Sequence, residues 1–197
     1  MLRPNQARIA HFRADYATHV DFCDVLRNET KHLYLLAFLL MANHQESEHC
    51  FESMVKEAFR EETVFKEWVL SWIKRRLIEN AIKMVSPASA RCPQKRDLWG
   101  LGQCEPQRER TIDTVTKLAV FERFVFVISI LERYSDWDCA LLLGCGTNSV
   151  AQARIEALRR LPDRAALLSR GDRDGRYGFE VTPNQQSLQV FKRCLKA

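Results

Sequence analysis

The sequence lacks the short motifs that mark most enzyme active sites. It contains no glycine-rich phosphate-binding loop, no nucleophile elbow and no Cys-x-x-Cys pair suited to zinc. His44 and His49 lie off the i,i+4 spacing that places two histidine ligands on one face of a helix. We therefore expect a protein that acts by binding, not an enzyme, with no catalytic residue, no metal and no other cofactor.

Long apolar runs and a regular cysteine pattern are also absent. The most apolar run, residues 33–42, is too short to cross a bilayer, and residues 1–16 lack the apolar core of a signal peptide. The 7 cysteines are scattered, and an odd number argues against a disulfide framework. These features predict a cytoplasmic protein without a membrane segment, in which Cys50 and Cys139 pack as small apolar side chains.

Apolar and basic residues are both well represented. Hydrophobic residues make up 46% of the 197 positions, which is enough for two compact helical cores. The formal net charge is +5 and the pI is near 8.9, so binding to nucleic acid is permitted but not required.

The segment 118–161 carries the most informative pattern, LAVFERFVFVISILERYSDWDCALLLGCGTNSVAQARIEALRRL. Its apolar spacing predicts helices near 113–133, 136–143 and 147–161. Gly144 lies where the short helix must end, because glycine reaches positive φ at low cost. Thr147 or Ser149 is expected to cap the last helix. This order is typical of a helix-turn-helix, whose second helix enters the major groove of DNA.

The earlier part of the chain predicts a second group of helices, near 31–42, 46–59 and 63–85, after a leading helix that ends near Asn28. Asn43 interrupts the pattern, and Ser86 and Pro87 end it, because proline lacks the donor that a helix interior needs. The segment 86–112 holds prolines, glycines and many charges without periodicity, which indicates a linker.

Taken in order, these two groups of helices resemble regions 2 and 4 of bacterial RNA polymerase sigma factors of the extracytoplasmic-function group. In the second group the match runs without a gap over 118–161. In the first it covers LYLLAFLLMANHQESEHCFESMVKEAF and FKEWVLSWIKRRLIENAIK, the latter matching the Phe-x-x-Trp-Leu opening and basic helix of the family.

The resemblance implies an all-α protein of two small helical domains. Residues 1–86 would form a region 2-like domain, 87–112 a linker and 113–168 a region 4-like helix-turn-helix domain, with a tail of unassigned role at 169–197. The implied function is transcription initiation. The chain would bind the RNA polymerase core through the clamp of its largest subunit and direct it to promoter −10 and −35 elements. An anti-sigma protein is a further candidate partner.

Residue matching assigns the DNA contacts to two helices. Those in the −10 helix are Lys74, Arg75, Glu79 and Lys83. Those in the second helix of the helix-turn-helix are Thr147, Asn148, Ser149, Gln152, Arg154 and Arg159. Gln152 suits adenine, and Arg154 suits guanine or phosphate. Trp68 is expected in the core because its family counterpart is, and Trp72 is expected to join it.

The polymerase contact of the family is an Asp-Leu-Val-Gln-Glu run. The aligned residues are His49, Cys50, Phe51, Glu52 and Ser53, so the resemblance places polymerase binding at His49, Glu52 and Ser53. His49 and Ser53 replace the two outer acidic residues, which weakens charge complementarity with a basic clamp helix.

Two other functions remain open on the sequence. One is a sigma-like interaction protein that keeps the fold without promoter selectivity, favoured by His49, Ser53, Ala151 and Ala153, where charged or contacting side chains of the family are missing. A neutral recognition helix would favour it further. The other is a dimeric helix-turn-helix repressor with an unrelated N-terminal domain, against which the two ungapped matches argue.

The linker prediction can be tested by limited proteolysis. Cleavage should concentrate within 86–112, while fragments close to 22–85 and 115–161 survive, because aperiodic, proline-containing segments are cut before packed helices. Mass spectrometry of the digest gives the cut sites. One protected product spanning all three segments would contradict the division into two domains.

Overall fold

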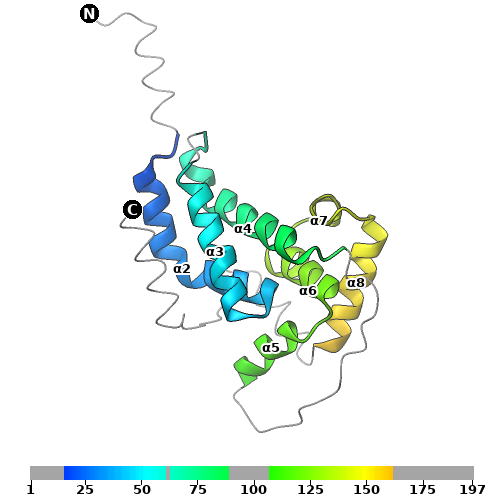
Figure 1. The fold of residues 1–197 in the computed structure, drawn as a ribbon. Helices are drawn as coiled ribbons and strands as arrows, with labels where there is room; N and C mark the ends of the chain where they lie inside the picture. Colours follow the sequence, from blue (N-terminus) through cyan, green and yellow to red (C-terminus); the bar gives the residue numbers. More distant parts are fainter. Residues whose placement is uncertain (1–15, 61–62, 89–106, 162–197) are drawn as a thin grey trace, which may run out of the picture.

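The computed structural model describes residues 16–60, 63–88 and 107–161 (Figure 1). Of these residues, 80% lie in helices and none lies in a strand, which confirms the all-α prediction. No helix among the described residues combines the length and the apolar character needed to span a membrane. The tail at 169–197 and most of the predicted linker lie outside the described residues.

The first helical unit, residues 16–88, contains α2 (His19–Met41), α3 (His44–Ala58) and α4 (Val69–Val85), which pack against one another. Thr18 begins α2 with a capping box, and Asn43 begins α3 by accepting from the amides of Gln45 and Glu46. The break expected near Asn28 is wrong, because α2 continues through it as one helix.

Apolar side chains from all three helices meet inside this unit. They include Phe22, Leu26, Leu33, Leu40, Met54, Ile73 and Leu77, each with almost no exposed surface. Cys50 is buried among them, and burial raises the pKa of its thiol to about 12. The expectation that Cys50 packs as a small apolar side chain is therefore confirmed.

The start of α4 departs from the sequence expectation. A short 3-10 turn, η1 (Lys66–Trp68), precedes the helix and leaves Trp68 60% exposed, so the prediction of a core tryptophan is wrong. The turn sets Trp68 outside the buried stripe that begins at Val69 and continues through Ile73. Trp72 is partly buried at the edge of the core, where its ring meets Phe22 edge-on at 5.7 Å.

The second helical unit is defined along the chain as residues 107–161. It contains α5 (Gln107–Thr116), α6 (Val120–Val125), the π-helical segment η3 (Phe126–Leu131), α7 (Asp136–Leu143) and α8 (Thr147–Arg160). Of these, α5 packs against α2 of the first unit. The single helix expected at 113–133 is wrong, because the chain leaves helical geometry between α5 and α6. The start of α5 also lies inside the predicted linker.

The bounds of α7 and α8 follow the sequence prediction closely. Ser135 caps α7 by accepting from the Asp138 amide at 3.1 Å, and Gly144 ends α7 in the left-handed region with φ 61°. The caps expected from Thr147 or Ser149 are wrong, since Gly146 occupies the capping position of α8 and no side chain bonds there. Val150, Ala153 and Ala157 form the buried inner face of α8.

The two helical units touch through buried polar contacts as well as apolar ones. Arg123 is only 4% exposed, and its Nε donates to the carbonyl of Leu40 at 3.1 Å. Its Nη1 donates to the carbonyl of Thr116 at 3.2 Å. In a second polar contact, Lys74 Nζ in α4 lies 2.9 Å from Glu132 Oε2 after η3. The guanidinium of Arg123 therefore joins α2 to α6 across the boundary of the units.

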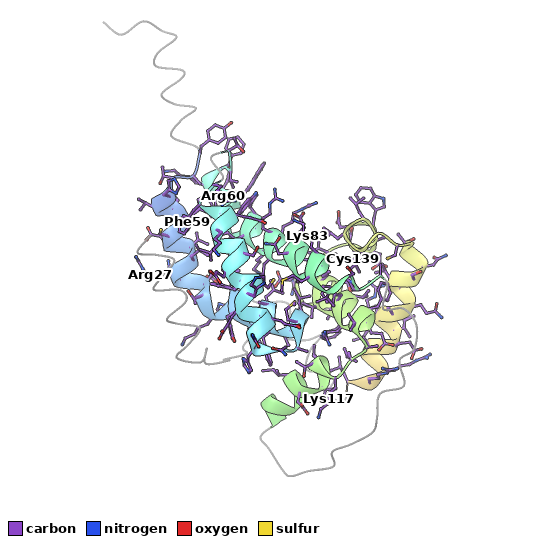
Figure 2. The ribbon with its side chains drawn as sticks, in the orientation of Figure 1. Arg27, Phe59, Arg60, Lys83, Lys117 and Cys139 are labelled. Atoms are coloured by element: carbon purple, nitrogen blue, oxygen red, sulfur yellow. The ribbon has the colours of Figure 1, made fainter. Side chains whose placement is uncertain are left out.

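Replacing Arg123 with methionine tests this contact. The Leu40 and Thr116 carbonyls would lose a buried donor, so Arg123→Met should lower the free energy of unfolding by about 1–3 kcal/mol. Arg27 lies on the outer side of α2 (Figure 2) and, within the described part of the chain, pairs with Asp24 three residues earlier, so Arg27→Met should cost at most about 0.5 kcal/mol. Urea unfolding followed by circular dichroism measures both. Equal losses of unfolding free energy in Arg123→Met and Arg27→Met would contradict a stabilising role for the Arg123 contacts.

Candidate nucleic-acid interface

The outward face of α8 is defined here as Asn148, Gln152, Ile155 and Arg159. These residues are spaced three or four apart, so they share one side of a helix with 3.6 residues per turn. All four are exposed, in contrast to the buried inner face. Thr147 is exposed at the start of the helix and Ser149 is half-buried beside it. The structure thus brings most of the predicted recognition residues to one accessible surface.

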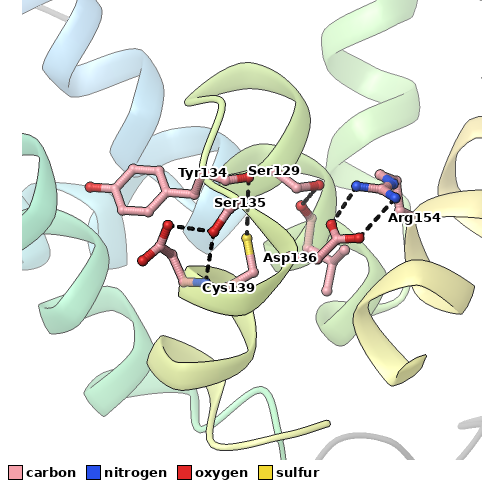
Figure 3. Close-up of polar contacts among 8 residues, drawn as sticks. Ser129, Tyr134, Ser135, Asp136, Cys139 and Arg154 are labelled. Carbon is pink, nitrogen blue, oxygen red and sulfur yellow. Dashed lines mark hydrogen bonds and ion pairs between the residues drawn. The ribbon is translucent and has the colours of Figure 1, made fainter. Parts of the chain in front are cut away.

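Arg154 takes a different position. Its two terminal nitrogens lie against the two carboxylate oxygens of Asp136 in α7, with Nη2 to Oδ2 at 3.0 Å (Figure 3). Such a two-pronged guanidinium–carboxylate contact fixes both side chains in orientation. Arg154 therefore ties α8 to α7. Its contact with DNA stays a prediction, and it would require Arg154 to leave Asp136.

The residues around the start of α7 form a local network (Figure 3). Ser135 Oγ donates to Asp138 Oδ2 at 2.5 Å and holds the first turn. The thiol of Cys139 points toward the Tyr134 carbonyl, and burial, with smaller contributions from Asp136 and Asp138, raises its pKa to about 12. Cys139 is thus an inert core thiol at neutral pH, as its apolar position in the sequence predicted.

The cations of α4 are paired with acidic or amide groups. Lys74 contacts Glu132 across the two units, while Arg75 and Arg76 contact Glu79 at 3.0 and 2.9 Å. Lys83 Nζ lies 3.5 Å from Asn80 Oδ1. A phosphate group would have to compete with each of these partners. The two glutamates offset part of the charge of these four cations, so the cationic face predicted for the −10 helix is partly neutralised within the protein.

A cluster of aromatic side chains lies at the start of α4, with Trp68 exposed and Tyr16 and Phe65 half-buried, and the sequence analysis missed it. The ring of Tyr16 stacks on Phe65 at 4.7 Å, and Phe65 meets Trp68 edge-on at 5.3 Å. An exposed aromatic ring can stack on an unpaired purine or pyrimidine base. The available signal was Lys66 and Glu67 immediately before Trp68, since two charged residues are typical of a solvated turn.

The predicted polymerase-binding residues share one face of α3. His49 is exposed, and Glu52 and Ser53 are half-buried one turn later. Cys50 and Phe51 between them point into the core. Glu52 Oε1 lies 2.8 Å from Lys56 Nζ, which offsets its charge. The geometry gathers the three residues but leaves them with little negative charge, as expected from His49 and Ser53.

Comparison with known proteins adds no assignment. No known protein family, no characterised protein and no solved structure matches this chain. A function for the chain must therefore be argued from its own residues and geometry.

The Lys74–Glu132 contact yields a stability prediction. Glu132 is only 9% exposed, so Lys74→Met would strand a nearly buried carboxylate. We expect Lys74→Met to lower the free energy of unfolding by about 1–2 kcal/mol, which lies between the values typical of exposed and of buried ion pairs.

Arg75→Met is the matched control because the Arg75 side chain is 53% exposed, and it should cost less than about 0.5 kcal/mol. Adding Glu132→Gln to Lys74→Met should restore part of the loss, which a double-mutant cycle by thermal unfolding measures. A purely additive cycle would show that the two groups do not interact.

Proposed function

We propose that this chain is a sigma factor-like transcription initiation protein that binds the RNA polymerase core and places α8 in the major groove of promoter DNA. The outward face of α8 carries the proposal. It presents Asn148 and Gln152, whose amides can pair with base edges, on a helix held by α7 in helix-turn-helix order. The sequence resemblance to sigma regions 2 and 4 supplies the transcription context.

The role of α4 in this proposal is capture of the −10 strand. Trp68, just before α4, offers a surface on which a base can stack. Lys74, Arg75 and Lys83 within α4 offer cations for the phosphates of the strand. Because each cation exchanges an internal partner for phosphate, its net gain is smaller than for an unpaired cation. The proposal therefore implies DNA binding that depends weakly on salt compared with strongly basic DNA-binding domains.

A second candidate is a sigma-like interaction protein that binds polymerase or another regulatory protein without reading promoters. The specific observation in its favour is the pairing of charges on both candidate DNA-binding helices. Arg154 is held by Asp136, Arg159 by Glu156 and Arg75 by Glu79. Cations that already have a carboxylate partner contribute less of the sequence-independent attraction that brings proteins to DNA.

Run-off transcription distinguishes the two candidates. Purified bacterial core polymerase, the full chain and a promoter library should yield transcripts from a subset of templates. Gln152→Ala should lower their yield about 10-fold, the size expected for one lost bidentate base contact. Asn28→Ala, which changes an exposed amide on α2, should leave the yield unchanged. Binding to core polymerase without template-dependent transcripts would instead establish the interaction protein.

A further inference from the structure

Ile155 is a large apolar side chain at the centre of the outward face of α8. It is 50% exposed, although the inner face of the same helix buries Val150, Ala153 and Ala157. The sequence pattern alone is ambiguous here, since Arg154 and Ile155 compete for the inner position. The ion pair of Arg154 with Asp136 resolves it, because it turns Arg154 toward α7 and leaves Ile155 outside.

The neighbours of Ile155 toward the start of α8 on this face are amides, and Arg159 follows one turn later. Gln152 lies one turn before it and Asn148 one turn earlier still, and both are exposed. With a rise of about 1.5 Å per residue, Gln152 and Ile155 are separated by about 4.5 Å along the helix axis. That separation is comparable with the spacing of adjacent base pairs, so the two side chains can meet neighbouring positions in a groove.

The chemistry of these side chains is selective. Glutamine and asparagine amides pair with the N6 and N7 edge of adenine, and an apolar side chain packs against the C5-methyl group of thymine. Guanine is read mainly by arginine. Each arginine of α8 already has a carboxylate partner: Arg154 has Asp136, Arg159 has Glu156 and Arg160 has Glu122. The positions met by Gln152 and Ile155 therefore favour A·T pairs, whereas Arg159, one turn further along, would read guanine only after leaving Glu156.

We propose that α8 selects duplex DNA containing adjacent A·T pairs, with Gln152 reading adenine and Ile155 reading the methyl group of a neighbouring thymine. Ile155 is thus a specificity-determining residue, and Arg154 positions it through Asp136. The inference rests on the proposed binding of duplex DNA by α8 and specifies which DNA sequences α8 prefers.

The test uses the full chain and thymine-to-uracil replacement, which removes the C5-methyl group and leaves the hydrogen-bonding edge intact. Duplexes are first selected from a random library and then remade with uracil at each selected thymine in turn. One uracil position should weaken binding about 4-fold, the value for burial of one methyl-sized group. Ile155→Ala should bind the thymine and uracil duplexes equally. Val20→Ala, at an exposed apolar residue of α2, should still bind the thymine duplex more tightly than the uracil duplex.

Each outcome bears on a separate claim. Enrichment of G·C pairs, or an unchanged thymine preference in Ile155→Ala, overturns the role of Ile155 while duplex binding by the chain stands. Failure of the chain to select any duplex overturns both the inference and the proposed promoter reading. Circular dichroism of Ile155→Ala should match the parent chain, because the removed atoms are half exposed.

Discussion

The buried inner face of α8 and the ion pair between Arg154 and Asp136 together set which side of α8 meets solvent, and the account of the recognition surface depends on this orientation. Both terminal nitrogens of the guanidinium contact the carboxylate, so the pair constrains rotation of α8 as well as its distance from α7. Ala153 and Ala157 on the inner face of α8 are small and buried, which suits close packing of this helix. With Arg154 held, Gln152 and Ile155 are left on the outside.

The contact between the two helical units sets a second constraint. Arg123 bonds the Leu40 carbonyl in the interior, and Lys74 pairs with a nearly buried Glu132. In this arrangement one of the cations expected to face the −10 strand is turned toward the second unit. A protein that used α4 and α8 on DNA together would have to exchange the Lys74–Glu132 contact for phosphate. The free energy of that exchange would then enter its affinity for DNA.

Much of the fold could be predicted because local signals decide it. The bounds of α7 follow from its apolar spacing and from Gly144, whose positive φ ends the helix, and Asn43 marks the start of α3. Other features depend on contacts that periodicity does not encode. Trp68 matches a core pattern but lies exposed in a 3-10 turn, where its ring meets Phe65. Arg154 occupies an apolar position of the pattern and is held there by Asp136, 18 residues earlier.

The central claim is that the outward face of α8 binds duplex DNA. Nuclear magnetic resonance of the full chain, with labelled isoleucine methyl groups and labelled side-chain amides, tests it most directly. Addition of a selected duplex should shift the signals of Ile155, Asn148 and Gln152, with a contact observed between the Ile155 methyl protons and a thymine methyl group. Unshifted α8 signals in the presence of bound duplex, or shifts confined to α3 around His49, would contradict the account.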